Sequence, residues 1–528
     1  MVMVGPMVAA DPVTSLTTVT SVGHSPPMNV NSLIPVVNND SSANAQIISL
    51  MFRPLLWIGT DLKIDWPQSI AQSIQVSADR QHFTIHLKSW QWSDGRPITA
   101  EDVLACLRMI QQFGSRYANG GMGGIPEIIE SAAVVNASTL QINLKNSVNP
   151  LWFELNGLSQ LIPIPAWRWG KYNIDALFKQ QNNPELVKVV DGPYVLQRFT
   201  PGRSVNFVEN QNYSGPPPLL KHLSFKMYTS SSSAFWALKS GIIQEGMIPH
   251  YLYDALWMVR NLKTCISNGG YGFNYVTLNF TNNNVLFFRD TKVRQALEMA
   301  INQSKIIKIA YHGMGVPSFN PVPTNPDTYL SPEMKALVTN PSRAYDPQKA
   351  DRLLSAAGWH KSADGIRVRR NGEKLSFTML VPDVSQTLVA VSELLKADWQ
   401  AVGADMHIRI LPFNLELAKL HPHGKWDAAM INWSYNPDYY PSGDGLFNTD
   451  GGSNYGDYSN HKMDYLIAAS SEGKGAKALY NYENYAADKV PVLFLPHPEY
   501  LIKYIDGLTH EQLLGSLHSV GCENYSFH

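Results

Sequence analysis

The chain has few charged residues, few cysteines and no long apolar run. Asp, Glu, Lys and Arg make up 16% of the 528 residues and the formal net charge is -1, so no basic face for nucleic acid is predicted. No stretch reaches the roughly 20 consecutive apolar residues of a membrane-spanning helix. The 44% hydrophobic content predicts a well-buried core and, at about 100 to 200 residues per domain, several packed units.

Only three cysteines are present: Cys106, Cys265 and Cys522. They are too few for a disulfide scaffold and too far apart for a zinc or redox motif. Thr99 and Asp102 form a capping-box pattern ahead of an amphipathic stretch that contains Cys106, which we expect in the core. A single disulfide between Cys265 and Cys522 is compatible with the count but is not established by it.

Motifs for catalysis are also missing. The chain has no phosphate loop, no H-E-x-x-H, no G-x-S-x-G and no C-x-x-C. We interpret His421 and His423 as a polar turn and the glycines at 120–124 as a flexible loop. Asp438 and Asp444 could act as the carboxylate pair of a glycosidase, but carboxylates are too common for their spacing to be informative. We therefore predict no catalytic residue, no metal site and no cofactor.

The N-terminal residues are short of charge, with no Lys or Arg before Arg53. Residues 2–10 resemble the end of a signal peptide, and a disordered extension fits them equally well. Residues 11–28 are rich in Thr, Ser, Val and Pro, which is typical of a linker. We expect residues 1–28 to be a signal remnant or linker.

What the sequence does contain is a mixture of short strands and amphipathic helices. Apolar residues alternate at 83–87 and 140–144, which predicts strands, and helical periodicity appears at 101–112, 231–240, 291–311, 347–357 and 388–402. Within the third of these helices, Arg294 and Glu298 are expected to form a solvated i,i+4 pair. The mixture predicts an α/β or α+β protein of several lobes.

Four segments, in order, resemble the family 5 extracellular solute-binding proteins, which include oligopeptide, dipeptide and nickel receptors. The first two are HLKSWQWSDGRPITAEDVLACLRMI from residue 86 and GPYVLQRFTPGRSVNFVENQNY from residue 192. The third is YVTLNFTNNNVLFFRDTKVRQALEMAINQSKII from residue 275. The fourth joins KADRLLSAAGW, LKADWQAVGADMHIRI and NWSYNPDYYPSGDGLFNTDGGSNYGDYSNHKMDYLI, from residue 349 onward. The resemblance spans residues 29–510.

This resemblance implies an α/β, two-lobed, periplasmic-binding-protein-like fold of type II, cluster C, with an extra small domain on the first lobe. By analogy the first lobe comprises residues 29–60, 170–271 and 497–528, the small domain 61–169 and the second lobe 272–496. A solute trapped between the lobes would close them by a hinge motion.

The implied function is that of an extracytoplasmic receptor of an ABC importer, at the membrane surface or in the periplasm. The implied location is the periplasm or the cell surface, in association with the membrane. Its partners would be a peptide or other small solute and the permease subunits in the membrane. We expect a monomer that is not an enzyme and binds no nucleic acid.

The ligand is less well defined, because the sequence departs from the peptide-binding pattern. Where such members carry an Asp for the ammonium of the peptide, this chain has Asn436, with Asp438 two residues on, and residues 381–386 lack the arginine of dipeptide receptors. An amide offers no charge to an ammonium. A longer peptide or an uncharged solute such as an oligosaccharide is therefore expected, and a secreted hydrolase is a further alternative. The predicted ligand-binding residues are Trp433, Tyr435, Asn436, Asp438, Tyr439, Asn39, Ser41 and Ser42.

Overall fold

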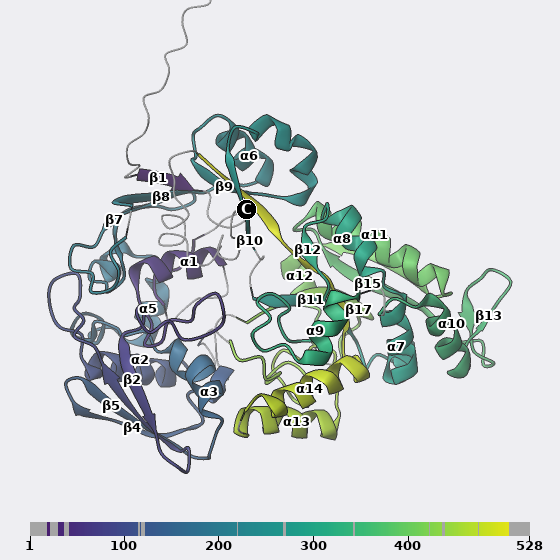
Figure 1. Cartoon of the computed structure of the whole chain (residues 1–528), viewed down its shortest axis with the longest axis horizontal. Coiled ribbons are helices and arrows are strands. Elements are labelled where there is room, and N and C mark those ends of the chain that lie inside the picture. The colour runs from purple at the N-terminus through teal and green to yellow at the C-terminus, as the bar shows by residue number, and fades with distance from the viewer. Residues whose placement is uncertain are drawn as a thin grey trace, which may run out of the picture.

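We describe the protein from a computed structural model. The structure describes residues 18–21, 30–35, 42–114, 117, 122–218, 220–267, 271–341, 344–421, 423–435, 439–473 and 475–505. Elements from the first half of the chain gather on one side of Figure 1 and those from the second half on the other, and β20 runs between the two sides. Three large sheets and their helices make up this mixed architecture.

The first-lobe sheet has seven strands in the order β10-β20-β9-β1-β8-β7-β6. β1 pairs in parallel with β8 and β9, and the other neighbours are antiparallel. The strands are β1 (Thr18–Ser21), β6 (Tyr194–Thr200), β7 (Ser204–Glu209), β8 (His222–Lys226), β9 (Glu245–Ile248), β10 (Lys263–Ser267) and β20 (Tyr500–Tyr504). The linker prediction is therefore wrong for residues 18–21, where the β-branched Thr and Val of TVTS favour a strand.

The small-domain sheet is antiparallel throughout, in the order β2-β3-β5-β4. Its strands are β2 (Ala71–Val76), β3 (His82–Leu87), β4 (Ile129–Asn136) and β5 (Thr139–Leu144). In β3, Phe83, Ile85 and Leu87 point to the core and their neighbours are more exposed, as the alternation predicts. The helix α2 (Ala100–Phe113) packs on this sheet through its buried face.

The second-lobe sheet has five strands in the order β16-β15-β17-β11-β18. β15, β16 and β17 run parallel to one another, and β11 is antiparallel to both of its neighbours. The strands are β11 (Gly272–Leu278), β15 (Ser376–Pro382), β16 (Asp405–Leu411), β17 (Ala428–Ser434) and β18 (Leu493–Leu495). Two short ladders, β12 (Gly315–Val316) with β19 (His497–Pro498) and β13 (His360–Lys361) with β14 (Arg367–Val368), complete the pairing.

Helices surround these sheets (Figure 1). On the side of the first lobe and small domain they are α1 (Ser42–Met51), η2 (Met122–Gly124), α3 (Pro150–Trp152), η3 (Phe153–Gly157), η4 (Leu158–Gln160), α4 (Ala166–Trp169), α5 (Ile174–Lys179), η5 (Pro184–Val187), α6 (Ser231–Lys239) and η6 (His250–Val259). On the side of the second lobe they are η7 (Asn283–Arg289), α7 (Thr291–Ala300), α8 (Gln303–Ala310), α9 (Pro332–Thr339), α10 (Pro347–Ala356), α11 (Gln386–Ala401), α12 (Phe413–Leu417), α13 (His461–Glu472) and α14 (Ala476–Lys489). Here η marks a 3-10 or π helix.

The predicted helices are confirmed with one correction. The periodic stretch 291–311 forms two helices, α7 and α8, because the side chain of Asn302 accepts a hydrogen bond from the Lys305 backbone N–H and caps a new helix. The capping box ahead of α2 is present, with the Thr99 N–H donating to Asp102 Oδ2 at 2.8 Å.

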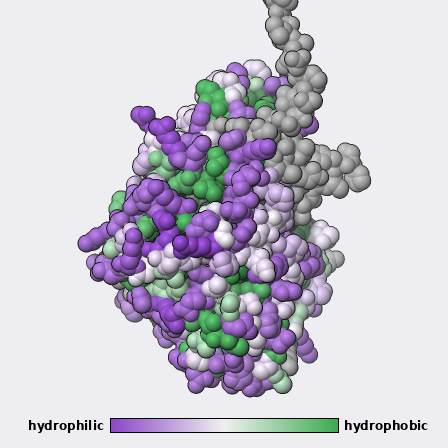
Figure 2. All heavy atoms as spheres, turned by 90° about the vertical axis from the view of Figure 1, so that its left-hand side faces the viewer, coloured by the Kyte–Doolittle hydropathy of each residue, from purple (hydrophilic) through white to green (hydrophobic). Residues whose placement is uncertain are grey.

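A single large core joins residues from all three sheets, and a smaller cluster lies between α6, β9 and η6. The face of the molecule seen in Figure 2 is mainly hydrophilic, and its apolar patches are small and separate. No helix among the described residues has both the length and the apolar character that crossing a membrane would require.

Candidate functional site

The chain passes between the two lobes along two adjacent paths. β10 leads toward β11, and β18 and β19 lead back into β20; β10 is antiparallel to β20, as β11 is to β18. His250 packs beside the second path, where its Nε2–H donates to the Glu499 carbonyl at 2.8 Å and its ring lies 4.9 Å from that of Tyr500. Burial lowers the pKa of His250 to about 4, so the crossing is packed around a neutral imidazole.

Three parallel strands of the second-lobe sheet end at one edge. In register, Pro382 of β15 lies beside Leu411 of β16, and β17 runs in the same direction next to β15. The residues that follow these strands, including α12 after β16 and Tyr435 after β17, therefore share this carboxyl edge. In open α/β sheets, ligands bind outside the carboxyl ends of the strands, which makes this edge the candidate site.

The predicted aromatic residues of this edge have different environments. Trp433 is half-buried, and its indole N–H is buried without a hydrogen-bond partner in the described chain. Tyr435 is fully buried, its hydroxyl donates to the Pro321 carbonyl at 2.7 Å, and its ring meets that of Trp433 edge-on. Tyr439 is half-buried, and burial raises the pKa of its hydroxyl. Trp433 is thus the one of the three with a polar group left to pair.

The remaining predicted ligand residues are not brought together by the described structure. Asn436, Asp438, Asn39 and Ser41 lie outside the described residues, and Ser42 is known only as the first residue of α1. Their roles stay predictions.

A direct contact joins the small domain to the second lobe beside this edge. The Asn156 amide Nδ2 donates to the Tyr440 carbonyl at 2.9 Å, and the Tyr440 N–H donates to Asn156 Oδ1 at 2.6 Å. Asn156 is fully buried. We call these two residues the interlobe latch. Sequence analysis missed Asn156, because nothing in LWFELNG distinguishes a buried interdomain amide from an ordinary polar residue.

The surroundings reinforce the latch. Asn149 Nδ2 donates to the Ser470 carbonyl at 3.0 Å, and the Tyr329 hydroxyl donates to the Leu62 carbonyl at 2.9 Å. Gly123 packs against the Asn156 backbone with φ +60°, and a Cβ there would lie 2.3 Å from the Asn156 carbonyl carbon. The flexible-loop prediction is therefore wrong at Gly123, which is buried in 3-10 helix η2 because this contact leaves no room for a side chain.

The helix α12 was also missed by sequence analysis. Phe413, Leu415 and Leu417 are exposed to 37%, 57% and 37%, whereas Glu416 between them is fully buried. Burial raises the pKa of Glu416 to about 8. The pattern FNLEL points to inward-facing leucines, and the structure has the opposite arrangement.

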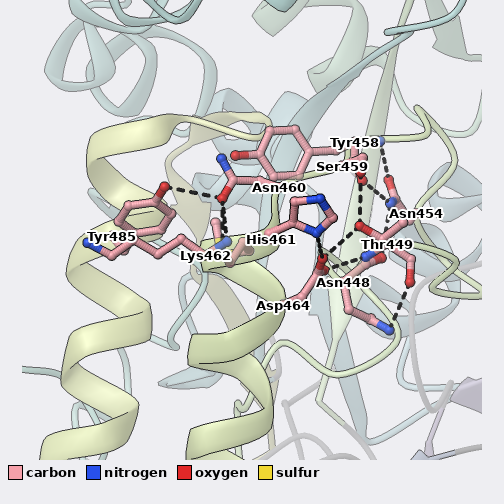
Figure 3. Close-up of polar contacts among 11 residues, drawn as sticks. Asn448, Thr449, Asn454, Tyr458, Ser459, Asn460, His461, Lys462, Asp464 and Tyr485 are labelled. Carbon is pink, nitrogen blue, oxygen red and sulfur yellow. Dashed lines mark hydrogen bonds and ion pairs between the residues drawn. The ribbon is translucent and has the colours of Figure 1, made fainter.

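The glycine-rich loop ahead of α13 is packed against its own lobe. Asn454 accepts from the Tyr458 N–H at 2.9 Å, and Thr449 donates through its N–H and its hydroxyl to the two carboxylate oxygens of Asp464 (Figure 3). Asn460 caps α13 through the backbone N–H groups of Lys462 and Met463. These contacts pack the loop against itself and against α13.

Two of the three cysteines lie among the described residues. Cys265 on β10 is disulfide-bonded, Cys106 is free and buried, and Cys522 lies outside the described residues, so the pairing of Cys265 with Cys522 stays a prediction. In the part of the chain that the structure describes, no group of three or more His, Cys, Asp or Glu residues could hold a metal ion.

Comparison with known proteins identifies the family. The family model of the bacterial extracellular solute-binding proteins, family 5 (middle region), matches residues 67–457, well over half of the chain. The chain belongs to this family. As a family 5 solute-binding protein it is one of the binding proteins of ABC transport, which confirms the predicted family.

Two relatives show how far this family 5 protein has diverged. It is 24% identical over 457 residues to the oligopeptide-binding protein AppA of Bacillus subtilis (strain 168), covering 83% of this chain and 79% of AppA. It is 26% identical over 393 residues to the nickel-binding periplasmic protein of Escherichia coli (strain K12), covering 72% and 69%. The structure of Bacillus subtilis AppA in complex with a nonapeptide superposes with a TM-score of 0.71 at 19% identity, covering 96% and 98%. The predicted α/β, two-lobed fold is thereby confirmed.

Proposed function

We propose that this family 5 protein is the extracytoplasmic receptor of an ABC importer that binds oligopeptides between its lobes and delivers them to a membrane permease. It does so as a monomer and leaves the solute chemically unchanged. The lobes that close on the solute are residues 29–60, 170–271 and 497–528, together with β1, on one side and 272–496 on the other. The small domain 61–169 moves with the first lobe.

The observation that carries this proposal is the interlobe latch. The aromatic residues that we expect at the ligand are Trp433 near the end of β17 and Tyr435 and Tyr439 after it. Tyr440, the next residue in sequence, is hydrogen-bonded to Asn156 across the lobes. A solute that contacts these aromatic residues when the lobes are together would therefore favour the latch. The oligopeptide named for the Bacillus relative supports a peptide as the solute.

Native mass spectrometry of the purified protein, followed by calorimetry and small-angle scattering, tests the proposal. We expect peptides of several residues to bind with one-to-one stoichiometry, to reduce the radius of gyration and to be recovered intact. Oligosaccharides and nickel–histidine complexes serve as competing solutes. Tight binding of one of these without peptide binding would refute the peptide assignment, and turnover that persists through repurification would refute the receptor.

Asn436 provides a test of charge at the expected ligand position. If a neutral part of the solute faces it, Asn436→Asp should weaken binding, because the new carboxylate would be buried without a partner. If an amine faces it, the same change should strengthen binding. Calorimetry on wild type, Asn436→Asp and Asn436→Ala separates these outcomes, and equal affinities for all three would remove Asn436 from the site.

A further inference from the structure

Glu416 of α12 is a buried acid whose charge the surrounding chain does not match. Its side chain is fully buried, and neither carboxylate oxygen accepts a hydrogen bond from the described residues. Buried charges are normally paired and hydrogen-bonded, because an unpaired one loses its hydration without compensation. An orphan acid inside a folded protein therefore points to a partner that arrives from outside.

Two other fully buried carboxylates each have a partner for one oxygen. Asp191 accepts a hydrogen bond from the Arg53 N–H at 3.2 Å, and Glu483 accepts one from the Ser331 N–H at 2.9 Å. In both, the second oxygen has no partner among the described residues, whereas Glu416 lacks a partner for either oxygen. Glu416 thus differs from these buried acids in having no hydrogen-bond donor in the described chain for its carboxyl group.

The position of Glu416 is that of the candidate site. The helix α12 directly follows β16 and packs on β15. Glu416 therefore lies at the carboxyl edge of the second-lobe sheet, on the buried side of α12. Val384 and Ile410, at the same ends of β15 and β16, are exposed to 54% and 49%. Phe413, Leu415 and Leu417 of α12 are exposed as well.

The same edge carries a second buried polar group without a partner in the described chain, and this one is a hydrogen-bond donor. The indole N–H of Trp433 on β17 is buried without an acceptor in the described chain, and it is a donor only. A molecule that satisfied both groups would bring a cation for Glu416 and an acceptor for Trp433. A peptide offers both, as an amine or guanidinium together with backbone carbonyls.

Among the described residues, no charged group shifts the pKa of Glu416. β15 carries no ionisable residue in SFTMLVP, and Glu416 is the one ionisable residue of FNLEL. β16 carries Asp405, His407 and Arg409, none of which contributes to this shift. Burial is the sole cause of the raised pKa of Glu416, with no charged group contributing. In the empty protein at neutral pH the carboxyl is therefore largely protonated.

We propose that Glu416 is a specificity-determining residue whose carboxylate receives the positively charged group of the bound solute, an ammonium or a guanidinium. This inference rests on the proposed function and adds to it that the preferred peptides are cationic at this position. When the cation binds, the O–H bond of the neutral carboxyl breaks, the proton passes to solvent, and the carboxylate pairs with the cation. About one proton is released for each solute bound.

Calorimetry with matched peptides tests the proposal. In the first pair both peptides are N-acetylated, and one carries Lys where the other carries norleucine. In the second pair neither peptide contains Lys or Arg, and one has a free amino terminus where the other is acetylated. The two pairs therefore separate a side-chain cation from the terminal ammonium. We expect Glu416→Gln to weaken binding of one cationic member by roughly tenfold or more and to leave the neutral peptides unchanged. Titrations in buffers of different ionisation enthalpy measure the number of protons released on binding. For a cationic peptide this number should be about one for wild type and zero for Glu416→Gln.

Controls separate this role from a structural one. Glu393→Gln changes an exposed acid on α11 and should leave all affinities and proton release unchanged. Glu416→Met provides a second uncharged variant in case the amide perturbs the fold. Equal affinity of wild type and Glu416→Gln for cationic and neutral peptides alike would overturn the proposal.

A small-probe experiment keeps this inference distinct from the peptide assignment. Millimolar methylguanidinium or butylammonium should raise the melting temperature of wild type more than that of Glu416→Gln, with butanol as the neutral control. If no peptide binds but this difference is present, the peptide proposal fails and the cation site stands. If both proteins respond equally, the cation site fails whatever the natural solute.

Discussion

Two buried ionisable residues of the second lobe, Arg294 and Glu416, are accommodated in opposite ways. Arg294 donates to the Phe288 and Val490 carbonyls at 2.7 and 2.8 Å and to the Thr291 hydroxyl at 3.1 Å, and its guanidinium lies over the Phe280 ring. Glu416 has no such partners in the described chain. A buried guanidinium whose donors are all used stabilises the fold, whereas a buried carboxyl without partners is available to a ligand.

Arg294 also corrects a prediction. We expected it to form a solvated i,i+4 pair with Glu298, but its side chain is 3% exposed and Glu298 accepts the Phe494 N–H instead. The spacing is compatible with a surface pair, yet α7 packs on α10 and contacts α14 and β18, which encloses both side chains. The backbone carbonyls at the end of α14 then provide the acceptors for the guanidinium.

The largest effect that we expect is from Arg294→Met. Removing the guanidinium leaves several buried carbonyls without donors, which should lower the free energy of unfolding by about 3–5 kcal/mol. The midpoint of guanidinium chloride unfolding measures this loss. Lys292→Met, which removes an exposed cation from the same helix, should change the midpoint little; a comparable loss in both variants would show that Arg294 has no special structural role.

Glu416→Gln should raise the free energy of unfolding, and the size of this gain should depend on pH. The pKa of Glu416 is about 8 in the folded protein and about 4.5 when unfolded, so its contribution to stability is full below about pH 4.5 and is lost as pH rises toward 8. At pH 9 and without solute, the variant should be more stable than wild type by roughly 2–4 kcal/mol, and at pH 4 the two should be similar. Unfolding curves at both pH values check this. A difference that is independent of pH would mean that the carboxyl is not buried as described.

Asn156 is hydrogen-bonded like Arg294, but its partner, Tyr440, lies on the other lobe. Its hydrogen bonds are therefore expected to form only when the lobes are together. Asn156→Ala should cost the closed form about 1–2 kcal/mol, and we expect it to weaken ligand binding roughly tenfold and to enlarge the bound radius of gyration. Asn156→Asp keeps the acceptor for the Tyr440 N–H and should lose less. Gln112→Ala, at an exposed position of α2, is the matched control. Unchanged affinity in Asn156→Ala would separate the latch from ligand binding.

Much of the fold could be predicted from the sequence because it depends on local pattern. The amphipathic periods of α2 and α10 and the alternation of β3 and β5 state which face is buried. Asn302 shows the limit, since its capping of α8 breaks a stretch that periodicity alone presents as one helix.

The candidate site could be predicted only in part, because its chemistry depends on tertiary contacts. Trp433 was found through the resemblance of its segment. Asn156 and Glu416 carry no local signal: one is defined by a partner 284 residues away, and the other lies in FNLEL, where burial of the acid in place of the leucines contradicts the hydrophobic pattern.

The strand order has a consequence for how the protein is made. All four strands of the small-domain sheet lie between residues 71 and 144, whereas the first-lobe sheet needs β1 and β20, and the second-lobe sheet needs β11 and β18. A ribosome that has released residues up to 490 has therefore delivered every strand of one large sheet and left the other two incomplete. Neither lobe can complete its sheet before β18 and β20 have been synthesised. The small domain is therefore the first unit whose sheet is complete. The two lobes between which we place the solute complete their sheets almost together, near the end of synthesis.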